Sequence, residues 1–236
     1  MSIMLLFAKK AGSLEESMEI TDILIHITEW IGTIAFSVSG AIHAIGKKLD
    51  LLGVVVLGCL TALGGGCVRD LLMGHTPPRA FSNFEYLILA TVSALAVFMI
   101  AWFFRKGYLA HLALLEQVNN IFDAIGLGAF SVVGVQMALD GGYGDNLFFC
   151  IFLGATTGCG GGMLRDIMCA KIPGVLTKHI YALASAAGGA LYWLMVSLKA
   201  SELLSVSCGM LIVIAIRMLA TYFRWSLPKL KSLDME

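Results

Sequence analysis

Residues 58–70 read GCLTALGGGCVRD, and residues 154–166 read GATTGCGGGMLRD. The two blocks share the pattern GGGxxRD at an offset of 96 residues. A second match lies upstream of each block, where GTIAFSVSG at residues 32–40 aligns with GLGAFSVVG at residues 126–134 at an offset of 94. Repeated segments in the same order predict that the chain contains two copies of one structural unit.

The composition places this repeat in a membrane. Hydrophobic residues make up 58% of the 236 residues, charged residues make up 14%, and mean hydropathy is +0.87. Soluble domains average about 45–50% and about 25%. Sixteen Lys and Arg balance sixteen Asp and Glu, so the chain lacks the strongly basic surface that binds nucleic acid. These values exclude an ordinary soluble domain and indicate a polytopic membrane protein.

Seven apolar stretches are long enough to cross a bilayer, for which a helix needs about 20 residues. We expect an all-α integral membrane protein with seven transmembrane helices, arranged as two inverted three-helix repeats plus a seventh helix. The predicted spans are Ile23–Ala44, Leu51–Met73, Phe84–Phe104, Ile121–Leu139, Leu147–Cys169, His179–Leu198 and Leu203–Phe223. The predicted divisions are an N-terminal extracytoplasmic tail (1–22), repeat 1 (23–104), a cytoplasmic linker (105–120), repeat 2 (121–198), and the seventh helix with a cytoplasmic tail (199–236).

The number of spans sets the topology. Each repeat holds three spans, and an odd number turns the second copy upside down, as in transporters and some channels whose pathway lies between the repeats. With seven spans, nine Lys and Arg residues fall on one side of the bilayer and four on the other, while Arg69, Arg165 and Arg217 lie inside spans. The positive-inside rule then predicts a multi-pass protein of the cell (inner) membrane, with its N-terminus extracytoplasmic and its C-terminus cytoplasmic.

Both glycine runs lie within predicted spans. They are Gly64, Gly65 and Gly66 in the second span and Gly160, Gly161 and Gly162 in the fifth. Each glycine costs a helix roughly 1 kcal/mol relative to alanine, so we expect these runs to bend or unwind the helix. Such backbone is tolerated at membrane depth where it is buried in protein or lines a wet cavity. We therefore predict pore-lining kinks, with close helix packing as the alternative explanation.

Four ionisable side chains follow the glycine runs, namely Arg69, Asp70, Arg165 and Asp166. Charged groups within spans are costly, so they usually face a bundle interior or water and pair with other groups. Adjacent residues point about 100° apart on a helix. We therefore expect the arginines to pair across the repeat, with Glu29 or Asp123, or with backbone carbonyls, and not with their neighbouring aspartates. Two interpretations of Arg69 and Arg165 stay open: gate charges at the mouths of a pore, or anchors that snorkel to the interface.

Hydroxyl side chains also recur with the repeat. The candidate pore hydroxyls are Ser37, Thr61, Ser131 and Thr157. They could coordinate a permeating cation, or they could bond back to the helix carbonyl four residues earlier. The sequence contains no HExxH, GxSxG or CxxC motif, so we predict no catalytic residue, no metal site, no cofactor and no enzyme activity.

The seven spans, the inverted repeats and the doubled GGGxxRD motif closely resemble the prokaryotic branch of the TRIC (trimeric intracellular cation) channel family, whose bacterial members are also called glycine transporters. The resemblance covers about residues 23–223. It implies a homotrimer in the lipid bilayer with a separate pore in each protomer. It also implies conduction of potassium, with sodium as a second candidate ion, around kinked second and fifth helices. Animal members carry a lysine-containing lipid-contact motif where this chain has Arg-Asp, so phosphoinositide binding is not carried over.

The function that we expect is a potassium-permeable cation channel with its pore between the two repeats. The alternative is a secondary transporter of a small solute such as glycine, because inverted repeats with broken helices suit alternating access equally well. The sequence itself does not separate these two functions.

Overall fold

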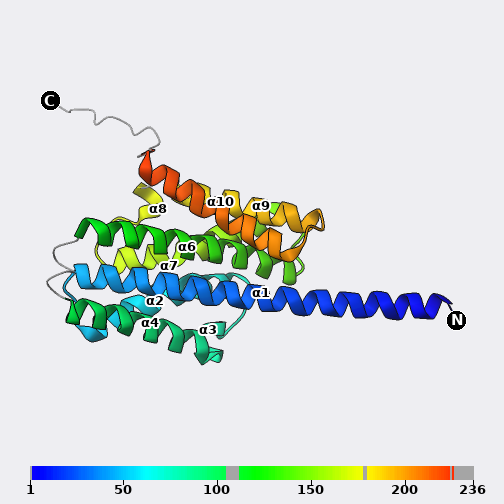
Figure 1. Cartoon of the computed structure of the whole chain (residues 1–236), viewed down its shortest axis with the longest axis horizontal. Coiled ribbons are helices and arrows are strands. Elements are labelled where there is room, and N and C mark those ends of the chain that lie inside the picture. The colour runs from blue at the N-terminus through cyan, green and yellow to red at the C-terminus, as the bar shows by residue number, and fades with distance from the viewer. Residues whose placement is uncertain (1, 105–111, 178–179, 224, 226–236) are drawn as a thin grey trace.

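The computed structural model is a bundle of helices that lie roughly along one axis (Figure 1). It describes residues 2–104, 112–177, 180–223 and 225, and for residues 2–19 and 112–113 it describes the backbone alone. The helices are α1 (Ser2–Gly46), α2 (Leu51–Leu72), α3 (Arg79–Ser82), α4 (Phe84–Phe103), α6 (Leu112–Asp140), α7 (Leu147–Met168), α8 (Gly174–Thr177), α9 (Tyr181–Ser197) and α10 (Glu202–Tyr222). No strand occurs in these described ranges, and the all-α prediction is confirmed.

Six helices are long and apolar enough to cross a membrane: α2, α4, α7 and α10, together with Ile20–Gly46 of α1 and Leu114–Asp140 of α6. The seventh, α9, is apolar but has 17 residues. At 1.5 Å per residue it is about 25 Å long, which is shorter than the roughly 30 Å hydrocarbon core. The seven predicted spans therefore correspond to these seven helices. The sixth was predicted to start at His179, which lies outside the described residues.

Two helices extend beyond the predicted span boundaries. α1 runs without interruption from Ser2, so the predicted tail 1–22 and the first span share one helix, which projects beyond the other helices (Figure 1). α6 begins at Leu112, so the last nine residues of the predicted linker 105–120 are helical, and the remainder up to residue 111 falls outside the described ranges.

Equivalent side chains cap the N-terminus of the second helix in each repeat. Asp50 caps α2, because its Oδ1 accepts a hydrogen bond of 2.7 Å from the backbone N–H of Gly53. Asn146 caps α7 in the same way, with 3.0 Å to the N–H of Phe149. Such caps satisfy amides that have no partner inside the helix. The two caps are 96 residues apart, so the internal repeat extends to the ends of these helices.

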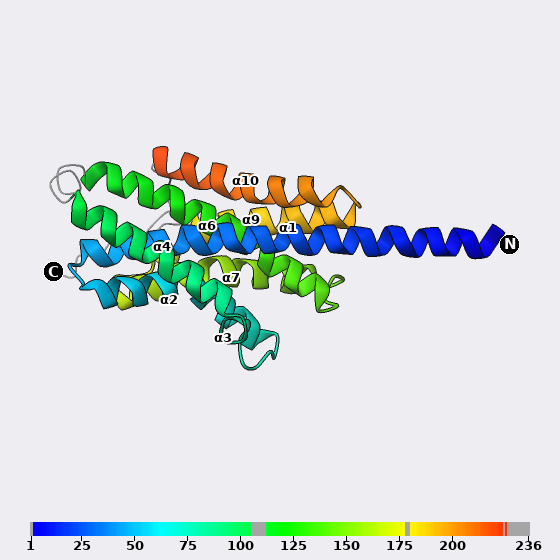
Figure 2. The ribbon, with the colours of Figure 1, turned by 60° about the horizontal axis from the view of Figure 1, so that its bottom comes forward.

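α1 and α6 form an antiparallel pair at the centre of the bundle. The Phe130 ring lies over Gly32, and the Phe36 ring lies over Gly126, which is the equivalent contact 94 residues later. These reciprocal contacts are those expected of two copies related by a two-fold axis in the membrane plane. α10 packs outside this pair, beside α6 and α9 (Figure 2), and ends at the opposite end of the bundle from the start of α1.

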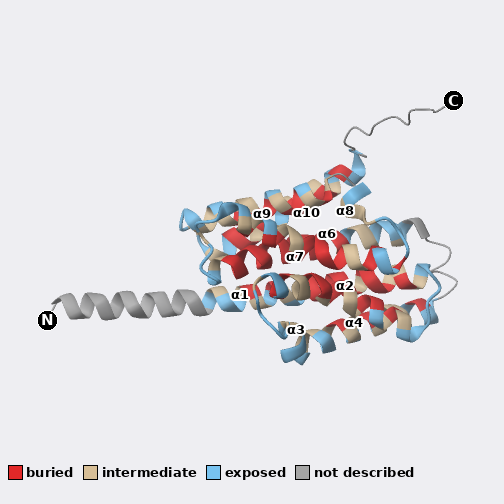
Figure 3. Cartoon of the chain, turned by 180° about the vertical axis from the view of Figure 1, so that it is seen from behind, coloured by how far each residue is buried: buried red, intermediate tan, exposed pale blue. Residues whose placement is uncertain are grey.

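The helices differ in how many of their residues are buried. In the most apolar part of α6, 83% of the residues are buried, against 11% for α4. The buried segments gather where α1, α2, α6 and α7 meet (Figure 3). These four helices therefore position any site in the interior of the protein.

Candidate functional site

The two glycine runs meet where α2 and α7 cross in opposite directions. A Cβ on Gly65 would overlap the carbonyl of Thr157, and a Cβ on Gly161 would overlap the carbonyl of Thr61. Both helices continue without a break through their glycines, so the predicted unwinding is wrong, while the predicted bend of these helices stays a prediction. Close backbone packing offsets the low helix propensity of glycine, which is the alternative that the sequence left open. We call this contact the glycine crossing.

The other glycines of the runs surround the glycine crossing. Gly160 packs on Gly65, and Gly64 faces the side chain of Leu164. Gly162 lies beside the Tyr181 hydroxyl, whereas Gly66 lines a cavity. The runs therefore lie in the interior of the protein and do not face lipid.

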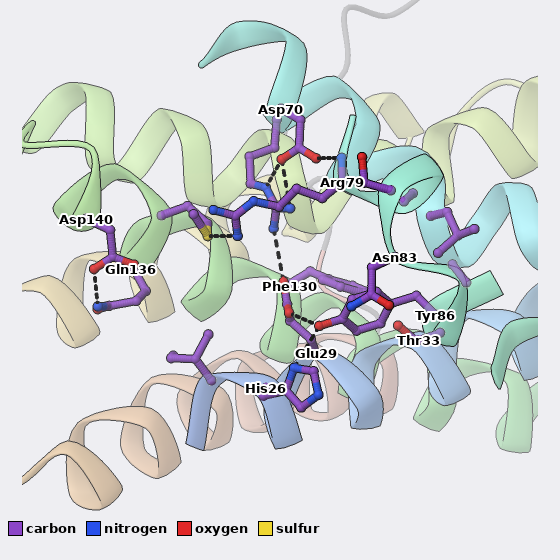
Figure 4. Close-up of a pocket in the computed structure, with 18 of the residues that line it drawn as sticks. His26, Glu29, Thr33, Asp70, Arg79, Asn83, Tyr86, Phe130, Gln136 and Asp140 are labelled. Atoms are coloured by element: carbon purple, nitrogen blue, oxygen red, sulfur yellow. Dashed lines mark hydrogen bonds and ion pairs between the residues drawn. The ribbon is translucent and has the colours of Figure 1, made fainter. Parts of the chain in front are cut away.

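A cavity of about 630 Å³, here called the first vestibule, opens beside the end of α2. Figure 4 shows it between α1, α2, α3, α4 and α6. Its charged lining consists of four carboxylates and two guanidinium groups, from Asp22, Glu29, Asp70, Asp140, Arg69 and Arg79. Phe130 forms part of the apolar lining.

Arg69 connects two helices across the first vestibule. Its Nε and Nη2 each lie 2.9 Å from Oδ1 of Asp70, and its Nη1 lies 3.5 Å from Oε1 of Glu29. The pairing with Glu29 was expected, but the expectation that neighbouring Arg and Asp would not pair is wrong. The long arginine side chain folds back over its own turn, so the 100° between the two Cβ directions does not prevent contact. Arg69 is 4% exposed and does not snorkel to a surface.

Tyr86 and His26 extend this network, and the sequence analysis missed both. The Tyr86 hydroxyl donates a hydrogen bond of 2.5 Å to Oε2 of Glu29 and lies 2.9 Å from Nδ1 of His26. His26 Nε2 lies 3.1 Å from Oε1 of Glu85. The available signal was Tyr181, which stands 95 residues after Tyr86 at the equivalent place in the second repeat.

A smaller cavity of about 150 Å³, the second vestibule, lies beside the end of α7. There Arg165 Nη1 lies 2.7 Å from Oδ1 of Asp123 and donates a bond of 2.6 Å to Oγ of Ser39, while Nη2 lies 2.9 Å from Oδ1 of Asp166. Arg165 is 5% exposed, and it repeats the arrangement of Arg69 in inverted form. Because α2 and α7 are antiparallel, the two vestibules lie at opposite ends of the glycine crossing.

Arg217 of α10 joins the second cluster and has no counterpart in the repeat. Its Nη2 lies 3.7 Å from Oδ2 of Asp123, and its guanidinium stacks 4.6 Å above the ring of Tyr181. Among the described residues, neither Arg217 Nε nor the Tyr181 hydroxyl has a hydrogen-bond partner. An additional buried cation therefore distinguishes the second half of the molecule from the first.

The four candidate pore hydroxyls line neither vestibule. Thr61 and Thr157 donate 2.6 Å bonds to the carbonyls four residues earlier, and so does Ser131, which also lies 2.5 Å from Ser185 Oγ. Ser37 instead donates to the carbonyl of Ala90 on α4 at 2.6 Å. All four side chains are fully buried. In this conformation their hydroxyl groups therefore form hydrogen bonds inside the protein that support helix packing.

Two stacked aromatic rings lie beside the first vestibule. Phe130, which lines this vestibule, stacks on Phe36 with 5.4 Å between ring centroids. Phe36 is 1% exposed and lies against Gly161 of the glycine crossing. We call these two rings the septum.

Comparison with known proteins gives relatives over most of the chain. The family described as "Glycine transporter" matches residues 26–102 and 120–197. The UPF0126 membrane protein YvgT of Bacillus subtilis is 37% identical over 84% of this chain and 92% of its own length. A UPF0126 membrane protein of Vibrio cholerae is 34% identical over 87% of this chain and 82% of its own length.

Solved structures also match. One is a TRIC cation channel studied for its conductance, with 37% identity and a TM-score of 0.73 over 87% of this chain and 97% of that one. The TRIC trimeric intracellular cation channel orthologue from Rhodobacter sphaeroides has 28% identity and a TM-score of 0.76 over 86% and 99%. A prokaryotic TRIC channel in 0.5 M KCl has 31% identity and a TM-score of 0.78 over 87% and 99%.

Proposed function

The chain belongs to the TRIC family, also called the glycine transporter family, and on that premise we propose that it is a potassium-permeable channel with one pore in each protomer of a homotrimer. The solved relatives are cation channels, which supports conduction of cations by this membrane protein. They do not favour the alternative of a secondary transporter for glycine.

The proposed pore runs from the first vestibule, past the septum and the glycine crossing, to the second vestibule. The observation that carries this proposal is the pair of polar cavities at opposite ends of one inverted crossing. Arg69 and Arg165 each follow their glycine at the crossing by four residues, which is about 6 Å along a helix. Polar cavities at equal depth on either side of a pseudo-two-fold axis are what a membrane pathway requires.

The first vestibule carries an excess of negative charge, whereas the charges that line the second vestibule balance. The first vestibule holds four carboxylates against two guanidinium groups, and the second holds Asp123 and Asp166 against Arg165 and Lys171. A cavity with an excess of negative charge concentrates cations and repels anions. Because Arg69 and Arg165 are each bound to two carboxylates, we assign them an anchoring role in the closed pore.

The proposed pore opens only if the two rings of the septum move apart. We propose that α2 and α7 shift against each other at the glycine crossing, where two backbones touch without intervening side chains. Such a shift would carry the ring of Phe36 away from Phe130. Following the positive-inside rule, we orient the first vestibule to the extracytoplasmic side and the second to the cytoplasm.

Bilayer recording of the purified protein tests this proposal. We expect unitary currents in KCl, absent from bilayers given detergent alone, and a reversal potential under K⁺/Na⁺ bi-ionic conditions that reports the preference between the two ions. Cross-linking in the membrane should give a trimer band. Saturable glycine uptake into proteoliposomes, without unitary currents, would overturn the channel proposal in favour of the transporter.

A further inference from the structure

The loops that follow α2 and α7 are anchored in the same way. Asp70 Oδ2 accepts a hydrogen bond of 2.8 Å from the backbone N–H of Arg79, and Asp166 Oδ2 accepts one of 2.8 Å from the N–H of Gly174. Arg79 is the first residue of α3, and Gly174 is the first residue of α8. The two positions are 95 residues apart, so they are equivalent places at the two ends of the proposed pore.

The two positions differ in the side chain that they place at a vestibule. Gly174 has none, whereas the Arg79 side chain extends over the first vestibule toward α6, as Figure 4 shows. Its Nη1 lies 3.1 Å from the sulfur of Met137, and a thioether is only a weak acceptor. Within the described part of the chain, no carboxylate forms an ion pair with Arg79.

Arg79 thus differs from the other arginine of this cavity. Arg69 is buried and bound by Glu29 and Asp70, whereas Arg79 is exposed and keeps its full charge at the entrance. A fixed positive charge at the mouth of a pore lowers the local concentration of cations, and salt screens this effect. The loop of the second vestibule has glycine at the equivalent position, so this loop position contributes a charge at the first mouth only, whereas the exposed Lys171 lines the second vestibule from another position.

We propose that Arg79 tunes conduction from one side, because its charge offsets part of the negative charge of the first vestibule and so lowers the cation current that enters there. This inference rests on the proposed channel function. With Arg79 in place, the ratio of the cation current that enters through the first vestibule to the current that enters through the second is lower than it is without this charge. The difference is about twofold at low salt, the effect of one exposed unit charge several ångströms away in water.

Single-channel recordings at both polarities test this inference. Unitary K⁺ currents of wild type, R79Q and R79K are recorded at both polarities in about 0.01 M and about 1 M KCl, where the screening lengths are about 30 Å and about 3 Å. We expect R79Q to raise the ratio of current entering through the first vestibule to current entering through the second about twofold at low salt, relative to wild type and R79K, and this difference should disappear at high salt. All three keep the backbone N–H that Asp70 binds, so the loop anchor is preserved.

The double variant R79Q/G174R moves the charge to the other mouth. Gly174 has no positive φ, so its backbone accepts an arginine. We expect this variant to shift the current ratio further than R79Q alone and in the same direction, with orientation in the bilayer read from a tag on the C-terminal side. If the wild type conducts but R79Q rectifies equally at low salt, the inference is overturned while the channel proposal stands. If the wild type carries no cation current, the channel proposal fails and this inference fails with it.

Discussion

Asp123 Oδ1 lies 2.7 Å from Arg165 Nη1, and both side chains are almost fully buried, with exposed fractions of 5% and 6%. The equivalent contact in the first repeat is looser, since Glu29 Oε1 lies 3.5 Å from Arg69 Nη1 and the glutamate is 14% exposed. The extra methylene of glutamate and the larger cavity account for the difference. The two halves of the inverted repeat are therefore held by ion pairs of unequal strength.

Removing the charge of Asp123 should destabilise the protein more than removing that of Glu29. Breaking a buried pair leaves an uncompensated charge and costs about 3–5 kcal/mol, and the longer contact of the less buried Glu29 should place its loss below this range. We expect D123N to lower the free energy of unfolding by about 3 kcal/mol and E29Q to lower it by less. Thermal and denaturant unfolding in detergent would measure this, and an equal or larger loss for E29Q would contradict it.

The glycine crossing gives a second prediction with a control inside the same run. Alanine at Gly65 or Gly161 would place a methyl group on a backbone carbonyl of the opposite helix, and overpacking of this kind costs about 1–3 kcal/mol or more. Alanine at Gly66 meets its nearest atom at 3.7 Å and gains about 1 kcal/mol in helix propensity. We expect G65A and G161A to unfold at lower temperature than wild type, and G66A to match or exceed it. Comparable losses in all three variants would show that the crossing is not the cause.

The overall fold could be predicted from the sequence because a bilayer restricts the structures that a spanning chain can form. Span length and the GGGxxRD repeat predicted the helices and their inversion, since backbone groups in lipid must bond within helices. The short length of α9 and the start of α6 at Leu112 could not be predicted from the sequence. Hydropathy detects apolar length and carries no information on where a helix extends past the membrane.

The site was readable only in part, because side-chain reach and helix crossings are tertiary properties. The sequence singled out Arg69 and Arg165, but the fold of each arginine back onto its neighbour depends on the carboxylates around it. The predicted unwinding was wrong because the free-energy cost of glycine was estimated for an isolated helix. In the folded protein, close packing of α2 against α7 at the glycine crossing offsets this cost. Tyr86 was missed because a lone tyrosine near a span end resembles an interfacial anchor.

The two matching tyrosines give a third prediction. The Tyr86 hydroxyl donates a hydrogen bond of 2.5 Å to Oε2 of Glu29, whereas the Tyr181 hydroxyl has no hydrogen-bond partner among the described residues. A hydrogen bond to a charged group contributes about 1.5–3 kcal/mol. We expect Y86F to lower the free energy of unfolding by about 1.5 kcal/mol and Y181F to leave it unchanged or slightly higher. Unfolding of the two variants side by side would test this, and a loss confined to Y181F would contradict it.

The septum gives the last prediction. Phe36 and Phe130 stack beside the first vestibule, and an apolar constriction excludes a hydrated ion until it widens. Replacing either ring by alanine widens this constriction and should raise the resting K⁺ flux through proteoliposomes. Phe→Ala substitutions in a core also cost about 3–5 kcal/mol, so F36L and F130L serve as milder variants that keep more of the packing. The flux should increase in the order wild type, leucine, alanine.

Phe148 provides the matched control, because it lies on α7 with 79% of its surface exposed and no part in the septum. F148A removes the same ring without opening a path between the vestibules, so its flux should equal that of the wild type. If the flux of F36A and F130A stays at the wild-type level while both proteins remain folded, the two rings do not form the barrier. An equal rise in F148A would indicate a leak through disturbed lipid contacts. A rise confined to the two septum variants would place the closed gate where the inverted repeats meet.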